Sequence, residues 1–176
     1  MSLRAEIQGG GIMIARAKLA GLILVTVMVV GCATGNFTPP DKSFSIAMPG
    51  TARERIGLAR TSQGQAPYQE YGCRYNQTSF SVGFTTIQGA EGAGDVIIRE
   101  YAGRVAPDMQ GCTSEAQPVS VDGHPGLDFK LYCDTQSTIG RLVVVGNRVY
   151  EISVQTRDDP DEREAKRFIE SFRISS

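Results

Sequence analysis

The sequence predicts an α+β fold, with a mostly antiparallel sheet packed between helices as an α/β/α sandwich. The main observation is a hairpin over 139–155. Its strands flank Gly146-Asn147, a pair that tolerates the backbone angles of tight hairpin turns. Both faces of this hairpin are apolar near its tip, so the sheet needs a cover on each side. Two amphipathic segments, 95–105 and 160–172, are expected to supply that cover.

Residues 1–31 are typical of a bacterial lipoprotein signal peptide, and Met13 is the best candidate for its functional start. Arg16 and Lys18 form a positive segment, and an apolar run follows that is too short to span a bilayer comfortably. The run ends in Val29-Val30-Gly31-Cys32, which resembles a lipobox. That resemblance implies cleavage before Cys32 and acylation of its thiol, with palmitate as a typical chain. An ordinary secretory leader that happens to contain a cysteine is the alternative.

The lipid would hold the mature chain at a membrane. Several acyl chains anchor a protein firmly, since each buried methylene contributes about 0.8 kcal/mol. Residues 32–43, with Pro39-Pro40, are expected to be a tether, and residues 44–176 a single domain. In a Gram-negative cell, the lipobox resemblance with Ala33 after the acylated cysteine implies sorting to the outer membrane, facing the periplasm of the cell envelope.

The domain is expected to run along the chain as a strand, a hairpin, a helix, a four-stranded meander and a final helix. Residues 51–67 are polar and predict an exposed connection, with a basic lip for an anionic partner or lipid headgroups as the functional alternative. The other expected elements before the central hairpin are strands at 44–48, 68–75, 79–88, 114–121 and 127–133, and a helix at 95–105.

The last helix is expected to begin at Pro160, where the missing N–H costs nothing. Its apolar residues recur at helical spacing and predict one buried face; they are Ala165, Phe168, Ile169 and Phe172. The acidic group Asp158, Asp159, Asp161 and Glu162 lacks the ligand pattern of a calcium loop, so helix capping is the preferred explanation.

Cys112 and Cys133 are the candidate disulfide, since exported proteins keep such bridges. If Asp122-Gly123 is a two-residue turn, the two cysteines lie directly opposite each other at a non-hydrogen-bonded position, close enough for a bond. Cys73 would then be free. A longer loop through His124 would shift the register, and Cys73 would compete.

Four segments together resemble the photosystem PsbP proteins and the bacterial DcrB-like lipoproteins. They are Phe44–Gly50, Val121–Gly126, Arg141–Tyr150 and Phe168–Arg173, and the resemblance covers nearly the whole mature chain. It implies an antiparallel sheet between helices and accessory, partner-binding roles. The shared motifs are turns and core aromatic residues, so no functional residue carries over.

The sequence offers few candidates for chemistry. His124, the only histidine, lies in a turn motif and excludes a histidine-based metal cluster. The glycine-rich loop 89–94 has neither the spacing nor the lysine of a phosphate site. Arg141, Arg148 and Tyr150 share one face of the central hairpin and are a possible anion-binding face. The alternative is that the arginines pack along the sheet.

Net charge excludes a nucleic-acid role. Three of the 18 basic and one of the 19 acidic residues precede Cys32, which leaves the mature part at −3. No catalytic residues, metal or cofactor are predicted. The expected function is a non-catalytic envelope lipoprotein that binds an unknown envelope partner. The alternatives are an enzyme assembled from separate loops, with a deep pocket and shifted titratable groups, or a small-ligand carrier with an enclosed apolar cavity.

Overall fold

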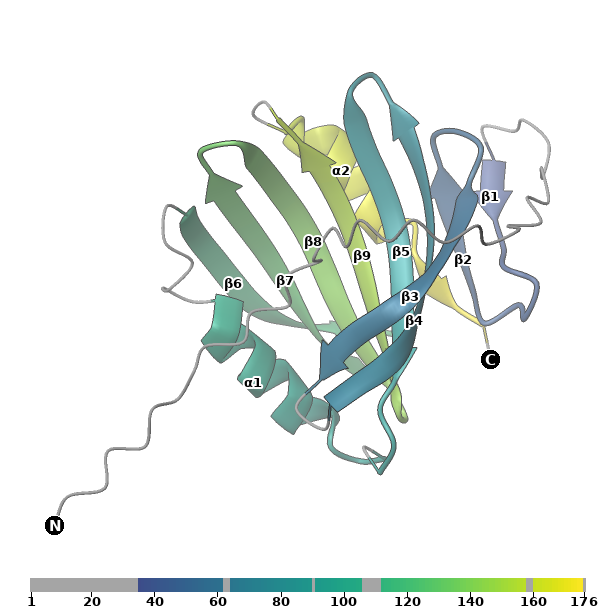
Figure 1. Cartoon of the computed structure of the whole chain (residues 1–176), viewed down its shortest axis with the longest axis vertical. Coiled ribbons are helices and arrows are strands. Elements are labelled where there is room, and N and C mark those ends of the chain that lie inside the picture. The colour runs from purple at the N-terminus through teal and green to yellow at the C-terminus, as the bar shows by residue number, and fades with distance from the viewer. Residues whose placement is uncertain (1–34, 62–63, 90, 106–111, 158–159, 176) are drawn as a thin grey trace, which may run out of the picture.

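The computed structural model describes residues 35–61, 64–89, 91–105, 112–157 and 160–175, which form a β-rich fold of two antiparallel sheets (Figure 1). The large sheet has seven strands in the order β3-β4-β5-β9-β8-β7-β6, and the small sheet has three in the order β1-β2-β10. In chain order the elements are β1 (Gly35–Phe37), β2 (Phe44–Met48), β3 (Arg53–Thr61), β4 (Gly64–Tyr75), β5 (Thr78–Thr86), α1 (Gly94–Val105), β6 (Cys112–Val121), β7 (His124–Cys133), β8 (Gln136–Val145), β9 (Arg148–Thr156), α2 (Glu162–Glu170) and β10 (Arg173–Ile174). The leader and Cys32 lie outside the described residues.

The predicted α+β sandwich is therefore wrong, and so is the α/β/α arrangement that the family resemblance implied. The two helices are short, with 12 residues in α1 and 9 in α2. The strand 44–48 was predicted correctly as β2, but it pairs with β1 and β10 rather than with the large sheet. A second β layer thus shares the covering role that was expected of helices.

A second correction concerns 51–67, the expected exposed connection. It forms β3 and the start of β4, which pair residue by residue from Arg53 opposite Gly72 to Thr61 opposite Gly64. The side chains of this hairpin are mostly polar, so the usual apolar alternation of a strand is weak. Backbone hydrogen bonds to β4 supply its order instead.

The central hairpin is confirmed. Val143 pairs with Tyr150 and Val144 pairs with Val149, with Gly146 in the turn at a φ of 61°. Alternation sends neighbouring side chains to opposite faces, so β8 and β9 contribute to two cores. Figure 1 shows α1 and α2 on opposite sides of the large sheet, which we call the α1 face and the α2 face.

The α2 face carries the larger core. Its residues come from β2, β4, β5, β6, β8, β9 and the C-terminal segment, and they include Phe44, Ile46, Tyr71, Phe80, Val82, Tyr150, Ile152, Phe168 and Phe172. The core on the α1 face is smaller and covers only one half of the sheet, with Ile98, Leu127, Phe129, Leu142 and Val144. On that face, β4, β5 and the C-terminal part of β9 carry mostly polar side chains instead.

The C-terminal helix begins two residues later than predicted. Asp161 is its N-cap and accepts hydrogen bonds from the backbone N–H groups of Arg163 and Glu164, so Pro160 lies before the helix. Phe168 is buried as predicted, and Phe172 is buried just beyond the end of the helix.

Candidate functional site

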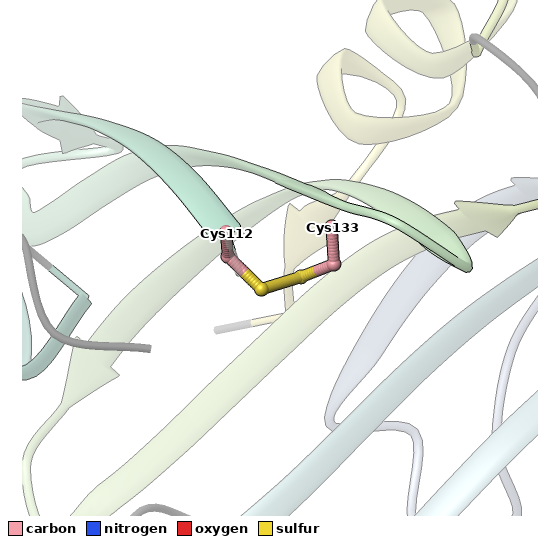
Figure 2. The surroundings of a disulfide bond; sticks show 2 residues. All are labelled: Cys112 and Cys133. Carbon is pink, nitrogen blue, oxygen red and sulfur yellow. A yellow bond between two sulfur atoms is a disulfide. The ribbon is translucent and has the colours of Figure 1, made fainter. Parts of the chain in front are cut away.

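The disulfide between Cys112 and Cys133 is confirmed (Figure 2). The two-residue turn has φ angles of 50° at Asp122 and 82° at Gly123, and it sets the register that places the cysteines opposite each other. Their Cα atoms are 4.2 Å apart, and the bond joins the end of β6 farthest from the turn to the end of β7. Cys73 is free and half-buried, and burial raises the pKa of its thiol.

The arginines of the predicted anion-binding face each have a carboxylate partner. Arg141 donates two hydrogen bonds to Asp128 on β7, at 2.5 and 2.8 Å, and this hydrogen bonding raises the pKa of Arg141. Arg148 donates to Asp41 at 3.1 Å and to the hydroxyl of Tyr150 at 3.3 Å. An external anion at this face would have to displace Asp128 or Asp41, so binding there stays a prediction.

His124 lines an open depression of about 500 Å³ between the start of α1 and the β6–β7 turn. Gly92 and Gly94 of the glycine-rich loop also line it, next to the carboxylate of Asp95. A Cβ at Gly94 would meet the ring of Pro125 at 2.6 Å, so glycine is needed where the loop packs against β7. Gly94 therefore has a packing role at the end of this loop.

A pair of carboxylates on the α1 face was not predicted. The registers of β4, β5 and β9 place Gly83 directly between Glu70 and Glu151. Adjacent strands are about 4.8 Å apart, so the two glutamates lie one strand either side of a residue that has no side chain. The ring of Tyr68 lies in the space above that glycine, and its hydroxyl donates to Glu70 at 3.5 Å.

The pair has unusual electrostatics. Desolvation, together with the charge of Glu70, raises the pKa of Glu151 to about 7. Desolvation and the two nearby carboxylates also raise the pKa of the Tyr68 hydroxyl. Glu70 has a cationic neighbour in Arg55 at 3.8 Å. Glu151 is thus partly protonated near neutral pH, which lets it take up or release a proton there.

This pair and the depression are separate features. None of Tyr68, Glu70 and Glu151 lines the depression at His124. An enzyme was expected to show titratable groups with shifted pKa values inside a deep pocket. In the described part of the chain, the carboxyl group with the raised pKa and the open depression lie in different places. The sequence could not reveal the carboxylate pair because only the pairing of β5 with β9 brings its members together.

The most exposed apolar side chains of the described residues lie on β3. Ile56 is 77% exposed and Leu58 is 66% exposed. Both lie on the α2 face, since they alternate with Gly57 and share that face with Glu54, opposite the buried Tyr71. Strand β3 is an outer strand of the large sheet, so one side of its backbone has no partner strand in that sheet. We call this feature, Arg53–Thr61, the β3 edge.

No protein-family model matches this chain, and no curated protein matches its sequence. The resemblance to the PsbP and DcrB-like proteins stays a prediction. Among the described residues, neither helix has the length and apolar character needed to cross a bilayer. The same residues contain no group of three or more His, Cys, Asp or Glu side chains arranged to hold a metal ion.

Proposed function

We propose that this protein is a lipid-anchored lipoprotein of the cell envelope that binds a polypeptide partner through the β3 edge, in an accessory and non-catalytic role. Its place would be the outer membrane, facing the periplasm. The observation that carries the proposal is the exposure of Ile56 and Leu58 on an outer strand of the large sheet.

The proposed location at the membrane rests on the signal-peptide-like residues 1–31. A positive segment, a short apolar run and Gly31-Cys32 together favour acylation of Cys32. Strand β1, Gly35–Phe37, lies inside the expected tether 32–43 but pairs with β2 of the domain. Only Ala33 and Thr34 therefore separate the acylated residue from this strand. Three residue steps reach at most about 10 Å, and the lipid would therefore hold the domain close to the bilayer surface.

The β3 edge has the properties of a strand-binding site. An outer strand offers unpaired N–H and C=O groups, to which an extended segment can add as a further strand. Two large exposed aliphatic side chains beside those groups would give such a segment apolar contacts. The opposite outer strand, β6, contains Pro118, which lacks an N–H group and makes that edge a poorer template.

The two alternatives have less support. A small-ligand carrier needs an enclosed apolar cavity, whereas the depression at His124 is open and is lined largely by glycine, proline and polar residues. An enzyme would gain most from Glu151, the carboxyl group with a pKa of about 7. Glu151 lies on the α1 face beside Gly83, which the Tyr68 ring covers, and it does not line the depression.

The anchor is tested by intact-mass measurement of protein extracted from membranes. The parent should begin at Cys32 and carry acyl chains, while Cys32→Ser should be unprocessed and lack them. Cys73→Ser, which changes a cysteine inside the fold, should be acylated like the parent. A parent chain without lipid, or one that begins at another residue, would end this part of the proposal.

Partner binding is tested by a photo-crosslinking residue at position 56 of the full chain in cells. The matched control is the same residue at Val96, an exposed apolar position of α1 that is 50% exposed. A discrete crosslinked product from position 56 and none from position 96 is expected. Equal products from both positions, or none from either, would contradict a binding role for the β3 edge.

A further inference from the structure

We infer that the partner at the β3 edge is a second copy of this chain, bound by antiparallel pairing of the two β3 strands about Gly57. The inference rests on the proposed function, since it names the occupant of the same edge. Four observations support it. They are which β3 residues direct their backbone N–H and C=O groups toward the free edge, the self-complementary sequence of β3, the open space at Gly57, and the proline in the opposite outer strand, β6.

The hairpin with β4 determines which backbone groups of β3 point toward β4 and which point toward the free edge. Thr61 and Gly64 flank a two-residue connection, so they form the hydrogen-bonded pair next to the turn. Hydrogen-bonded and non-hydrogen-bonded pairs alternate from there. The N–H and C=O groups of Gly57 consequently point toward β4, whereas those of Ile56 and Leu58 point toward the free edge.

The sequence of β3 is complementary to itself. Antiparallel pairing about Gly57 places Ile56 opposite Leu58 of the second copy, and Glu54 opposite Arg60 of the second copy. The first pair is apolar and the second joins opposite charges, both of which favour cross-strand pairing. Ile56 and Leu58 also carry the outward-pointing backbone groups, so the pairing in this register satisfies hydrogen bonds and side chains together.

Neighbouring registers are less favourable. Pairing about Ile56 places Glu54 opposite Leu58, and pairing about Leu58 places Arg60 opposite Ile56. Each sets a charged residue against an apolar one. A centre between two residues fails for another reason, because it brings outward-pointing backbone groups opposite groups that already bond to β4.

Gly57 suits the two-fold axis of this arrangement. The pair at the axis would be non-hydrogen-bonded, with Cα atoms about 4.5 Å apart. Position 57 is open, with no atom within 4 Å of a Cβ built there. On the α1 face, Arg55 would lie opposite Ala59 of the second copy rather than opposite another arginine. The close approach at the axis therefore brings neither crowding nor like charges.

The far edge of the sheet makes the assembly stop at two copies. Strand β6 has Pro118 within it and is tied to β7 by the Cys112–Cys133 disulfide. A contact that joins β3 to β3 uses the same surface on both copies and leaves no β3 edge for a third. The product would be a closed dimer in which two seven-stranded sheets form one continuous sheet.

The register is tested with single cysteines in the full-length lipoprotein in membranes, in a Cys73→Ala background. Gly57→Cys places one thiol from each copy at the axis, within disulfide range. Ala59→Cys is the matched control, since the two residues at position 59 would lie four positions apart, about 14 Å along the strands. On a non-reducing gel, Gly57→Cys should give at least ten times the dimer band of Ala59→Cys. Equal bands, or no dimer from Gly57→Cys, would overturn the register.

The identity of the occupant is tested by mass spectrometry of the product crosslinked from position 56. Peptides of β3 from this same chain would support the inference. A different protein would overturn the inference but leave the proposed function standing, and the absence of any product would count against both.

The apolar contact is tested by adding Ile56→Asp to Gly57→Cys. The disulfide-linked dimer should fall at least tenfold, while an unchanged far-ultraviolet circular dichroism spectrum shows that the fold is intact. An undiminished dimer band would contradict the apolar contact.

Discussion

The aromatic ring of Tyr68 occupies the space that a side chain at Gly83 would need. A Cβ atom at position 83 would overlap both the ring and the hydroxyl group. Phe129 covers Gly140 on the same face in the same way. Glycine inside a strand normally weakens a sheet, but here it lets an aromatic ring from a neighbouring strand lie against the backbone. The two glycines thus set how closely side chains cover the α1 face.

Gly83→Ala should destabilise the fold by about 1–3 kcal/mol, because the methyl group would displace the Tyr68 ring. Urea denaturation would measure this change. The control is a double-mutant cycle with Tyr68→Ala, in which Gly83→Ala should cost much less once the ring is gone. An equal cost with and without the ring would show that the contact is not the cause.

The pH dependence of stability should reveal Glu151. Its pKa is about 7 in the folded protein against 4.5 for an ordinary glutamate, so between these values the folded state binds more protons than the unfolded state. Stability from this group is therefore fully present below pH 4.5 and is lost as the pH rises through 7. Because Glu151 is partly exposed, we expect a loss of about 1–3 kcal/mol between pH 5 and pH 8.

Urea denaturation at pH 5 and pH 8 would test this expectation. Glu151→Gln removes the titrating group and should flatten the dependence. Glu115→Gln, which removes an exposed carboxylate of β6, should keep the dependence of the parent. If Glu151→Gln loses as much stability as the parent over this range, another group is responsible.

Removing the disulfide should destabilise the protein by about 3 kcal/mol. The bond joins residues 21 positions apart, and a loop of that length restricts the unfolded chain by roughly this amount. The double variant Cys112→Ala/Cys133→Ala, measured by urea denaturation, should show the loss. Cys73→Ala changes a half-buried free thiol and should cost clearly less. Peptide mapping without reduction should find the Cys112–Cys133 bridge, and a bridge through Cys73 would contradict the register.

Features that depend on short-range spacing could be predicted from the sequence. The pairing of Val143 with Tyr150 follows from Gly146-Asn147, and the pairing of Cys112 with Cys133 follows from Asp122-Gly123. A two-residue turn fixes the register of both its strands, so residues far from the turn are placed as well. The buried Phe168 could be predicted because helical periodicity is also local.

Features that depend on long-range pairing could not be predicted. The partner of β5 is β9, and no turn joins them, so the approach of Glu70 and Glu151 across Gly83 has no local signal. Strand β2 shows alternation, which identifies a strand but not the sheet it joins. The β3 edge was missed because its exposed side chains, Ile56 and Leu58, stand among polar residues that resemble a loop.

Phe168→Ala should destabilise the fold by about 3–5 kcal/mol, because it empties a site in the larger core. Phe168 is 4% exposed and meets Phe80 edge to face, with ring centroids 5.2 Å apart. This contact joins α2 to β5, so the loss should loosen the cover of the α2 face rather than the helix alone. Arg167→Ala, at the neighbouring exposed position, should change stability by only a few tenths of a kcal/mol. Thermal melting would compare the two variants, and similar melting temperatures would show that α2 does not hold this face of the sheet.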